Sequence, residues 1–284
     1  MKAFIREITP EPIWSALSSV KAFAVDTIDE LGAEFVPPRS IRGYIGSHSG
    51  FLRLGNAFLG YFKDYANLKS DERVLDVGCG IGRMAIPLTK FISKNGSYEG
   101  FDIVPLGIEW CATTITPRYP NFRFQHADIF NKEYNPSGKL KVSDFSFPYE
   151  DASFDFVFLT SVFTHMMPKD VSHYLSEINR VLRPGGRCLI TWFLLNDQSR
   201  RFVAQGRSEL RFEYAIEGCL TTNPVTPEAA IAFDEDEVMS FYRKFDLAPM
   251  QLLYGSWCGR DKFLSFQDIV IAKREHTQSR PEGR

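Results

Sequence analysis

The segment Val74–Arg83, with the sequence VLDVGCGIGR, constrains the fold of this chain more than any other feature. A short apolar run that includes Asp76 is followed by glycines at 78, 80 and 82, and these open a stretch with helical spacing. Glycine lets the backbone turn sharply and approach a ligand closely. In open α/β sheets, ligands bind outside the carboxyl ends of the strands. We therefore predict an α/β fold with a nucleotide-like ligand at this loop.

Strand and helix patterns alternate from residue 73 onward. Expected strands are 74–77, 98–101, 122–125, 155–159, 187–195, 252–255 and 267–273, and expected helices are 82–93, 105–116, 168–182 and 234–245. The run 155–159 is almost wholly apolar, which is typical of a parallel strand buried on both faces. The pattern predicts a Rossmann-like, doubly wound, mostly parallel seven-stranded sheet with helices on both faces. The turn 184–186, Pro-Gly-Gly, is expected to end the third helix.

Outside this alternation we predict three further segments. Residues 1–70 are expected to form a helical N-terminal extension or cap on a domain spanning 71–275. Residues 196–233 are polar and interrupt the rhythm, so they are interpreted as a lid or substrate insertion. Residues 276–284 are expected to be a disordered tail.

Composition narrows the function classes. The formal net charge is -2 and the pI is near 6.2, which does not favour a nucleic-acid partner. No apolar stretch has the length of a membrane span, and the N-terminal sequence lacks a signal peptide's apolar run. The five cysteines form no CxxC pair, and no ligand-spaced cluster suggests a metal. These observations predict a reduced, cytoplasmic protein without membrane contact or metal.

The spacing of the loop discriminates between cofactors. A dinucleotide-binding G-x-G-x-x-G would place its third glycine at Arg83, whereas this loop is G-x-G-x-G. The carboxylate of Asp76, just before the loop, would repel a pyrophosphate. It suits a ligand that carries an ammonium group and no phosphate, such as S-adenosylmethionine.

Five ordered motifs resemble those of the class I S-adenosylmethionine-dependent methyltransferases. They are VLDVGCGIGR at 74–83, YEGFDI at 98–103, HADI at 126–129, FDFVFLTSVFTHM at 154–166 and RVLRPGGR at 180–187. The resemblance covers residues 73–195 and is closest to bacterial enzymes that act on small molecules, some of them on sugars, glycans or natural products. It implies S-adenosyl-L-methionine as the cofactor.

The resemblance also assigns cofactor-binding roles. Asp102, at the end of the second strand, would accept the ribose hydroxyls, and Asp128 would accept the adenine amino group. The adenine faces and the methionine part would contact four further residues, namely Ile103, Ile129, Thr160 and Ser161. Ordinary structural roles stay open for these positions: turn glycines at 78, 80 and 82, a helix cap at Asp102, and a loop carboxylate at Asp128.

His165 follows the fourth strand and is the candidate general base for methyl transfer to a hydroxyl. A structural histidine is the alternative interpretation. Arg83 and Tyr44 are candidates for the methionine carboxylate. Core or surface roles are favoured for the less specific candidates, which are His48, Phe51, His126, Phe163, His173, Trp192 and the arginines at 200, 201, 207 and 211. The alternative role of these arginines is recognition of an anionic acceptor.

The leading hypothesis is a methyltransferase that acts on a hydroxyl of a small molecule, sugar or glycan, as a monomer or homodimer. An N-methyltransferase of a small amine, a nucleotide-dependent oxidoreductase and a non-catalytic cofactor-binding protein remain alternatives. The acceptor itself is not legible in the sequence, because the fold does not define the substrate.

Overall fold

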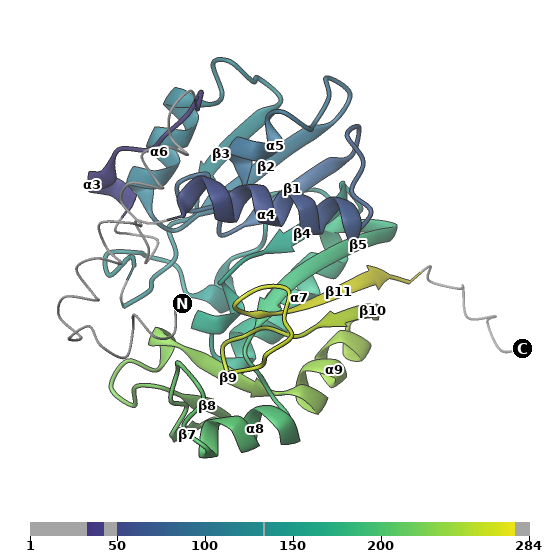
Figure 1. Cartoon of the computed structure of the whole chain (residues 1–284). Coiled ribbons are helices and arrows are strands. Elements are labelled where there is room, and N and C mark those ends of the chain that lie inside the picture. Colours follow the sequence, from purple (N-terminus) through teal and green to yellow (C-terminus); the bar gives the residue numbers. More distant parts are fainter. Residues whose placement is uncertain (1–32, 43–49, 133, 276–284) are drawn as a thin grey trace, which may run out of the picture.

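A computed structural model describes residues 33–42, 50–132 and 134–275 (Figure 1). Its centre is a seven-stranded sheet in the order β10-β11-β5-β4-β1-β2-β3. The strands are β1 (Arg73–Val77), β2 (Ser97–Asp102), β3 (Phe122–His126), β4 (Phe154–Leu159), β5 (Leu182–Trp192), β10 (Leu247–Leu253) and β11 (Asp268–Arg274). The first five are mutually parallel, and β11 is antiparallel to both of its neighbours. The predicted fold class is confirmed.

The chain runs from β1 outward through β2 to β3, then returns to β4 and continues to β5 on the other side. The strand order therefore reverses between β1 and β4. In doubly wound sheets this switch point opens a crevice at the carboxyl ends of the strands.

Helices cover both faces of the sheet. On one face lie α4 (Phe51–Asp64), α5 (Ala85–Leu88) and α6 (Pro105–Thr114), and on the other lie α7 (Pro168–Val181) and α9 (Glu235–Lys244). Side chains alternate across a strand, so Val74 joins the apolar cluster under α4 and α6 while Leu75 joins the cluster under α7. The α4 face is aromatic: the Phe62 and Phe158 ring centroids are 4.5 Å apart. In the N-terminal 70 residues the described helices are α3 (Arg39–Arg42) and α4.

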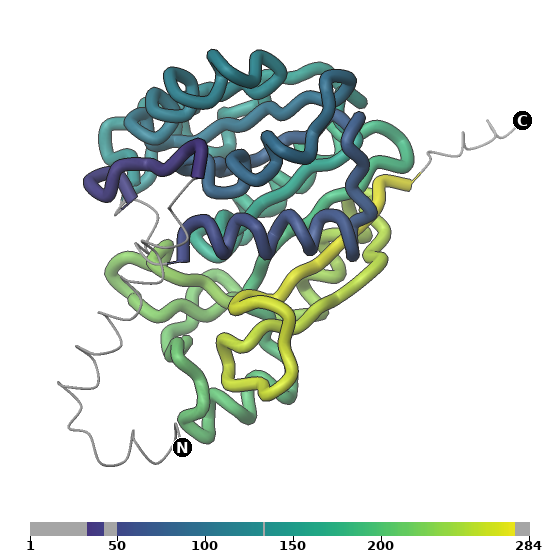
Figure 2. Tube along the Cα trace, turned by 45° about the horizontal axis from the view of Figure 1, so that its top comes forward, coloured from purple at the N-terminus to yellow at the C-terminus, as the bar shows by residue number. Residues whose placement is uncertain are grey.

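A second, four-stranded sheet follows β5. Its order is β6 (Leu194–Leu195), β9 (Ile231–Asp234), β8 (Cys219–Thr221) and β7 (Tyr214–Ile216), with α8 (Asp197–Ala204) and a 3₁₀ turn, η4 (Pro227–Ala229), in the connections. The segment predicted as a lid, 196–233, supplies most of this sheet. The loop 254–267 lies beside it (Figure 2), and Glu209 N donates a hydrogen bond to Trp257 O.

Asp268 joins the two sheets at a fully buried position. Its Oδ2 accepts hydrogen bonds from Leu194 N at 2.8 Å and from Trp257 Nε1 at 2.6 Å. Its Oδ1 accepts from Gly255 N at 2.7 Å and from Arg260 Nη1 at 3.1 Å. A buried carboxylate needs such partners, and these four hold the start of β6 and the loop 254–267 against β11.

Several predicted element boundaries were wrong. The helix expected over 82–93 is only the short α5, because Gly82 has a φ of +76° and Pro87 has no N–H. The Pro184-Gly185-Gly186 turn does not separate helix from strand; it lies within β5, where pairing with β4 jumps from Leu182 to Arg187. Strand β10 begins and ends earlier than the predicted 252–255. The predicted tail at 276–284 lies outside the described residues.

Candidate functional site

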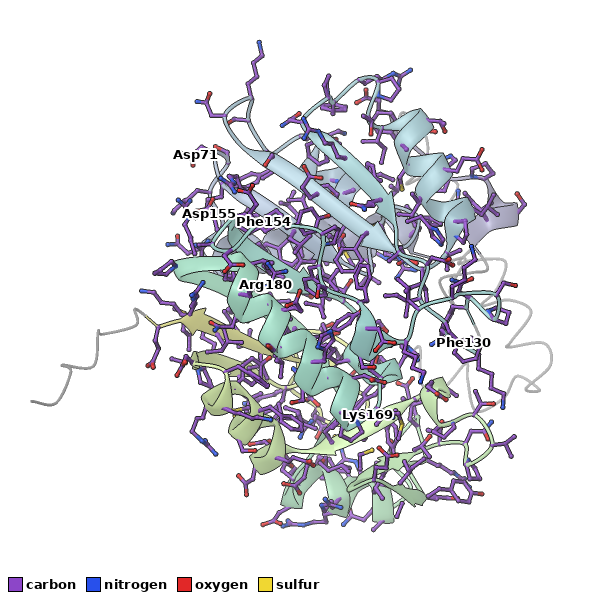
Figure 3. The ribbon with its side chains drawn as sticks, turned by 180° about the vertical axis from the view of Figure 1, so that it is seen from behind. Asp71, Phe130, Phe154, Asp155, Lys169 and Arg180 are labelled. Carbon is purple, nitrogen blue, oxygen red and sulfur yellow. The ribbon has the colours of Figure 1, made fainter. Side chains whose placement is uncertain are left out.

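A cavity of about 360 Å³ lies at the carboxyl ends of β1, β2 and β4. Its walls come from the glycine loop after β1, the residues after β2, residues 129–131 and Tyr134 after β3, and the turn after β4. Figure 3 shows Phe130, which lines the cavity, at the end of the sheet opposite to Asp71 and Asp155. The cavity therefore lies at the point where the strand order reverses, which is where doubly wound sheets bind their ligands.

Most of the predicted site residues meet here. Nine of them line the cavity: Asp76, Gly78, Gly80, Asp102, Ile103, Ile129, Thr160, Ser161 and His165. They come from four stretches of the sequence, one after each of β1, β2, β3 and β4, which the parallel strands bring to one edge of the sheet. Gly82 and Asp128 are not part of the lining.

Asp76 is 1% exposed and lies at the floor of the cavity. Its Oδ2 accepts a 2.6 Å hydrogen bond from the Tyr98 hydroxyl. Its Oδ1 is buried and has no hydrogen-bond partner among the described residues. Burial raises the pKa of Asp76 to about 8, with a smaller contribution from Asp102, against the lowering effect of Tyr98. A cation beside this carboxyl group would therefore favour its ionised form at neutral pH.

Asp102 fixes the glycine loop. Its Oδ2 accepts a 2.7 Å hydrogen bond from Gly80 N, and its Oδ1 accepts a 2.9 Å hydrogen bond from Val104 N. Burial raises the pKa of this carboxyl, and the two backbone hydrogen bonds oppose that rise. Asp102 thus fixes the glycine loop and also lines the cavity. Each of its oxygens has a second lone pair, so the carboxylate can still accept hydrogen bonds from a ligand.

Two of the loop glycines are required for different reasons. Gly78 has a φ of +81°, and a Cβ there would lie 2.4 Å from Cγ2 of Val162, in the turn after β4. Gly82 has a φ of +76°, and a Cβ there would lie 2.9 Å from Sγ of Cys111 on α6. Gly78 therefore allows the loop to lie against the turn after β4, while Gly82 allows the loop to pack on α6.

The end of β4 is a strained turn. Ser161 has a φ of +62°, an uncommon value for a residue with a side chain. Its N–H donates a 2.7 Å hydrogen bond to Oγ1 of Thr191, which is fully buried in β5. Its Oγ accepts a 2.9 Å hydrogen bond from Nε2 of Gln267. Strand β5, through Thr191, and the loop 254–267, through Gln267, therefore hold this turn in place.

His165 lies in the 3₁₀ turn η3 (Phe163–His165) and lines the same cavity. Its Nδ1 is 2.8 Å from the carbonyl oxygen of Glu228 in η4. A carbonyl oxygen only accepts hydrogen bonds, so Nδ1 carries the proton and Nε2 of the neutral ring carries the lone pair. The ring of Tyr134 stands edge-on to the imidazole, with centroids 6.0 Å apart. The insertion 196–233 thereby sets the tautomer of a cavity residue.

Arg83 is the guanidinium of the lining. It lies over the ring of Phe51, 5.5 Å from its centroid, and Arg42 lies over the same ring at 5.7 Å. Burial lowers the pKa of Arg83 to about 10, so the group is still charged at neutral pH. The cavity is therefore lined by two carboxyl groups, those of Asp76 and Asp102, and by the positively charged guanidinium of Arg83.

Other candidates from the sequence lie elsewhere. The side chain of Asp128 forms an ion pair with Lys139 at 3.6 Å. Phe163 and Trp192 are fully buried and pack against each other with centroids 4.9 Å apart, which is a core role. Of the insertion's arginines, Arg200 pairs with Asp234 and Arg207 with Asp261, and none of the four arginines lines the cavity.

Two further described histidines, His173 and His126, contact backbone carbonyls. His173 Nε2 lies 2.9 Å from Phe145 O, and the exposed His126 has Nε2 3.3 Å from Ile103 O. Tyr44 and His48 lie outside the described residues.

The sequence interpretation missed Tyr98 and part of the cavity wall. Tyr98 lies on β2, one strand over from Asp76, and the two-residue period of the strand was the available signal for its inward position. Phe130, Tyr134 and Met166 line the cavity from loops whose path has no sequence signal.

Metal-ligand clusters and membrane-spanning helices are both absent from the described residues. No group of three or more His, Cys, Asp or Glu side chains is placed there to hold a metal ion. Within the same residues, every helix is too short or too polar to cross a bilayer.

Residues 75–190 match the family model described as a methyltransferase domain. The chain is similar to the tRNA N(3)-cytidine methyltransferase METTL2 of Gallus gallus, with 28% identity over 170 residues, which are 57% of this chain and 38% of the relative. It is also similar to the 27-O-demethylrifamycin SV methyltransferase of Amycolatopsis mediterranei, with 34% identity over 131 residues, 45% of this chain and 41% of the relative. The chain thus spans about two fifths of the length of these curated relatives.

A solved structure shares the fold. The 1,6-didemethyltoxoflavin-N1-methyltransferase of Burkholderia thailandensis, solved with S-adenosylhomocysteine, superposes with a TM-score of 0.51. The alignment covers 95% of this chain and 92% of that one at 17% sequence identity, which supports the fold alone. Residues 75–190 are thus similar to a methyltransferase domain, and the glycine loop and the strand-end carboxyl groups Asp76 and Asp102 of the cavity lie within this matched stretch.

Proposed function

We propose that this protein transfers a methyl group from S-adenosylmethionine to a hydroxyl oxygen of a small molecule, sugar or glycan, with His165 as general base. The observation that carries the proposal is the orientation of His165. Its Nδ1–H donates a hydrogen bond to Glu228 O, and the residue lines the cavity. In the neutral ring the lone pair that can accept a proton is therefore on Nε2.

The cavity suits the amino-acid end of the cofactor. The buried Asp76 Oδ1, which has no hydrogen-bond partner among the described residues, offers an acceptor for the ammonium group. The Arg83 guanidinium in the same lining offers a donor for the carboxylate. Burying a zwitterion needs both, because each charge loses its hydration.

The nucleoside end suits the second and third strand ends. Asp102 keeps acceptor capacity for the ribose hydroxyls, and Ile103 and Ile129 present apolar surface for the adenine. The adenine amino group is assigned to the Asp128 position by resemblance. The Asp128 side chain, paired with Lys139, would have to turn to serve it.

When bound, S-adenosylmethionine supplies an electrophilic methyl group on a sulfonium. The chain's contribution is to hold the acceptor in line and to accept its proton. Fixing the reactants in line removes the entropic cost of their encounter. Nε2 of His165 takes the proton from the hydroxyl group that receives the methyl group. The resulting imidazolium is stabilised by the hydrogen bond from Nδ1–H to Glu228 O.

Calorimetric titration with S-adenosylhomocysteine, followed by an acceptor screen with mass-spectrometric detection of one added methylene, tests the proposal. His165→Ala is expected to lower kcat by about 10²–10⁴-fold while the Kd for S-adenosylhomocysteine changes less than threefold. His173→Ala is the matched control, since its imidazole also contacts a backbone carbonyl but lies outside the cavity lining. A product methylated on nitrogen, formed at full rate by His165→Ala, would favour the N-methyltransferase alternative and contradict the proposal.

We further propose a reducing, cytoplasmic location and a monomer or homodimer that needs no nucleic acid. The cysteine side chains support the location, because all five are buried free thiols. Size-exclusion chromatography with light scattering tests the oligomeric state.

A further inference from the structure

We infer that Gln267 is a positioning residue that leaves the Ser161 hydroxyl free to donate a hydrogen bond into the cavity, to the carboxylate at the amino-acid end of the cofactor. The inference rests on the proposed function and adds a pair of residues that determine ligand specificity. Three features carry it: the side of β1 on which Ser161 lies, the hydrogen bonds of its hydroxyl, and the way in which Gln267 is held.

The order of the strands separates two parts of the cavity lining. Strand β1 lies between β4 and β2, so Ser161, in the turn after β4, and Asp102, at the end of β2, are on opposite sides of β1. Asp76 of β1 pairs with β4 in parallel register, and Val162, the residue after Ser161, packs against Gly78. Ser161 therefore lies beside the glycine loop, on the side of β1 away from the proposed ribose site.

The Ser161 hydroxyl has a proton to donate. Its Oγ accepts a 2.9 Å hydrogen bond from Nε2 of Gln267. A serine hydroxyl has one O–H donor and two acceptor lone pairs, so a hydroxyl that accepts from an amide keeps its own proton for another partner. Among the described residues no group accepts that proton, and Ser161 lines the cavity. An oxygen atom of a bound ligand can therefore be its acceptor.

The chemistry of the cofactor then selects the ligand group. The amino-acid end of S-adenosylmethionine has an ammonium group, which only donates hydrogen bonds, and a carboxylate, which only accepts them. The ammonium is proposed to bind the buried Oδ1 of Asp76. The O–H of Ser161 suits the carboxylate, and hydrogen bonds to an ionised acceptor are the stronger kind. Ser161 thus adds a donor to the one proposed for Arg83, and it favours an amino acid over a simple amine.

The backbone of Ser161 supports a role for its side chain. Its φ of +62° lies in the left-handed region, which costs free energy for a residue with a Cβ. Such residues occur often at ligand sites and persist only where the surrounding structure holds them. Thr191 holds the Ser161 N–H, and Gln267 holds the Oγ. A glycine would fit this turn with less strain, but it would lack the donor.

Gln267 is itself held on both sides along the chain. It directly precedes Asp268, whose carboxylate accepts four hydrogen bonds. The carbonyl of the residue before it, Phe266, accepts a 3.0 Å hydrogen bond from Trp257 N. Strand β5 lies between β4 and β11, so Gln267, just before β11, reaches across the end of β5 to Ser161. The buried network that holds β6 therefore also presents this amide to the cavity turn.

Two ligands that differ by one group test the inference. The Kd of the full-length protein is measured by calorimetry for S-adenosylhomocysteine and for its decarboxylated form, which keeps the ammonium. Gln267→Glu introduces a carboxylate that only accepts, so the Ser161 proton turns toward it. We expect about a 10-fold or greater rise in Kd for S-adenosylhomocysteine and no rise for the decarboxylated ligand. Gln205→Glu, the same change at an exposed position outside the lining, should alter neither Kd.

A double-mutant cycle separates the hydrogen bond from the charge of the new carboxylate. Ser161→Ala keeps a Cβ in the strained turn and removes the donor, so we expect the same ligand-selective loss. Gln267→Glu added to Ser161→Ala should then raise the Kd by less than about threefold more. A full further loss in that background, or equal losses for the two ligands in Gln267→Glu, overturns the inference and leaves the proposed methyl transfer intact. Failure of the unsubstituted protein to bind either ligand overturns the proposed function instead.

Discussion

The Tyr98 hydroxyl donates a 2.6 Å hydrogen bond to Oδ2 of Asp76, and the other oxygen of that carboxyl is buried without a hydrogen-bond partner among the described residues. The pKa of Asp76 is raised to about 8, mainly by burial. At pH 7 about nine tenths of the carboxyl is thus protonated in the ligand-free protein. An ammonium group at Oδ1 would favour the ionised form.

We predict that binding of S-adenosylhomocysteine at pH 7 releases close to one proton and that the affinity rises with pH between 6 and 8, by at most about tenfold per unit. Titration calorimetry in two buffers of different ionisation enthalpy measures the released proton. Asp76→Asn should abolish the proton release and weaken binding. Proton uptake, or identical heats in both buffers, would show that Asp76 does not receive the ammonium.

Asp76 also makes stability depend on pH. Its pKa in the folded protein, about 8, lies above the ordinary value of 3.8, so between these values the folded state binds more protons than the unfolded state. Stability from this group is therefore complete below about pH 4 and declines as the pH rises to about 8. We predict that Asp76→Asn raises Tm more at pH 8 than at pH 5. Thermal unfolding at both pH values checks this, and an equal change at both would be inconsistent with a buried, titrating Asp76.

The glycine loop and helix α4 offer a matched pair of substitutions. Gly78→Ala should destabilise the fold by about 1–3 kcal/mol and abolish cofactor binding, because φ is +81° and the new Cβ would collide with Val162. Gly60→Ala, in α4 with no atom within 4 Å of the added Cβ, should stabilise by up to about 1 kcal/mol. Urea unfolding and calorimetry measure both effects. If Gly78→Ala still binds S-adenosylhomocysteine, the close contact between Gly78 and Val162 is not needed for the cofactor site.

The buried carboxylate of Asp268 should be essential to the fold. Asp268→Ala leaves Arg260, which is 6% exposed, without its carboxylate partner, and we expect a loss of about 3–5 kcal/mol in the free energy of unfolding. Asp261→Ala removes a carboxylate that is 90% exposed and pairs with Arg207, and little change is expected. Similar losses in the two variants would mean that the buried hydrogen bonds contribute little.

The strained turn after β4 should depend on Thr191. Thr191→Val removes the acceptor of the Ser161 N–H at nearly constant volume, so we expect a loss of about 1–3 kcal/mol together with a several-fold higher Kd for S-adenosylhomocysteine. Thr113→Val, an exposed position whose hydroxyl bonds to its own helix, serves as the comparison. If only stability changes and the Kd does not, the turn does not shape the cofactor site.

Strand ends explain how much of the site could be predicted. Asp76, Asp102 and Thr160 each lie at or directly after the end of a parallel strand, and such ends must meet at one edge of the sheet. Their convergence follows from the apolar periodicity of the strands and needs no knowledge of side-chain contacts. Asp128 fails the same argument because β3 ends at His126, and the chain beyond it turns the carboxylate toward Lys139.

Contacts between distant loops could not be predicted. The carbonyl of Glu228 that orients His165 is a backbone group, and every residue type has one. The residue type at position 228 therefore does not predict this contact. The exposure of Phe130 in the cavity depends on the path of the 129–134 segment, which has no periodic pattern. The shortness of α5 follows from Gly82 and Pro87, which both disfavour a continuous helix. The helical spacing of the apolar residues in this segment nevertheless predicted a helix over 82–93.

The two hydrogen bonds from Gly80 N and Val104 N to Asp102 have a consequence for the energetics of recognition. They hold the glycine loop in its final shape through contacts within the protein. The conformational entropy of that loop is therefore lost once, during folding, and not again each time a ligand arrives. A preorganised loop of this kind leaves more of the contact energy for affinity, and it lets product and fresh cofactor exchange without rebuilding the site.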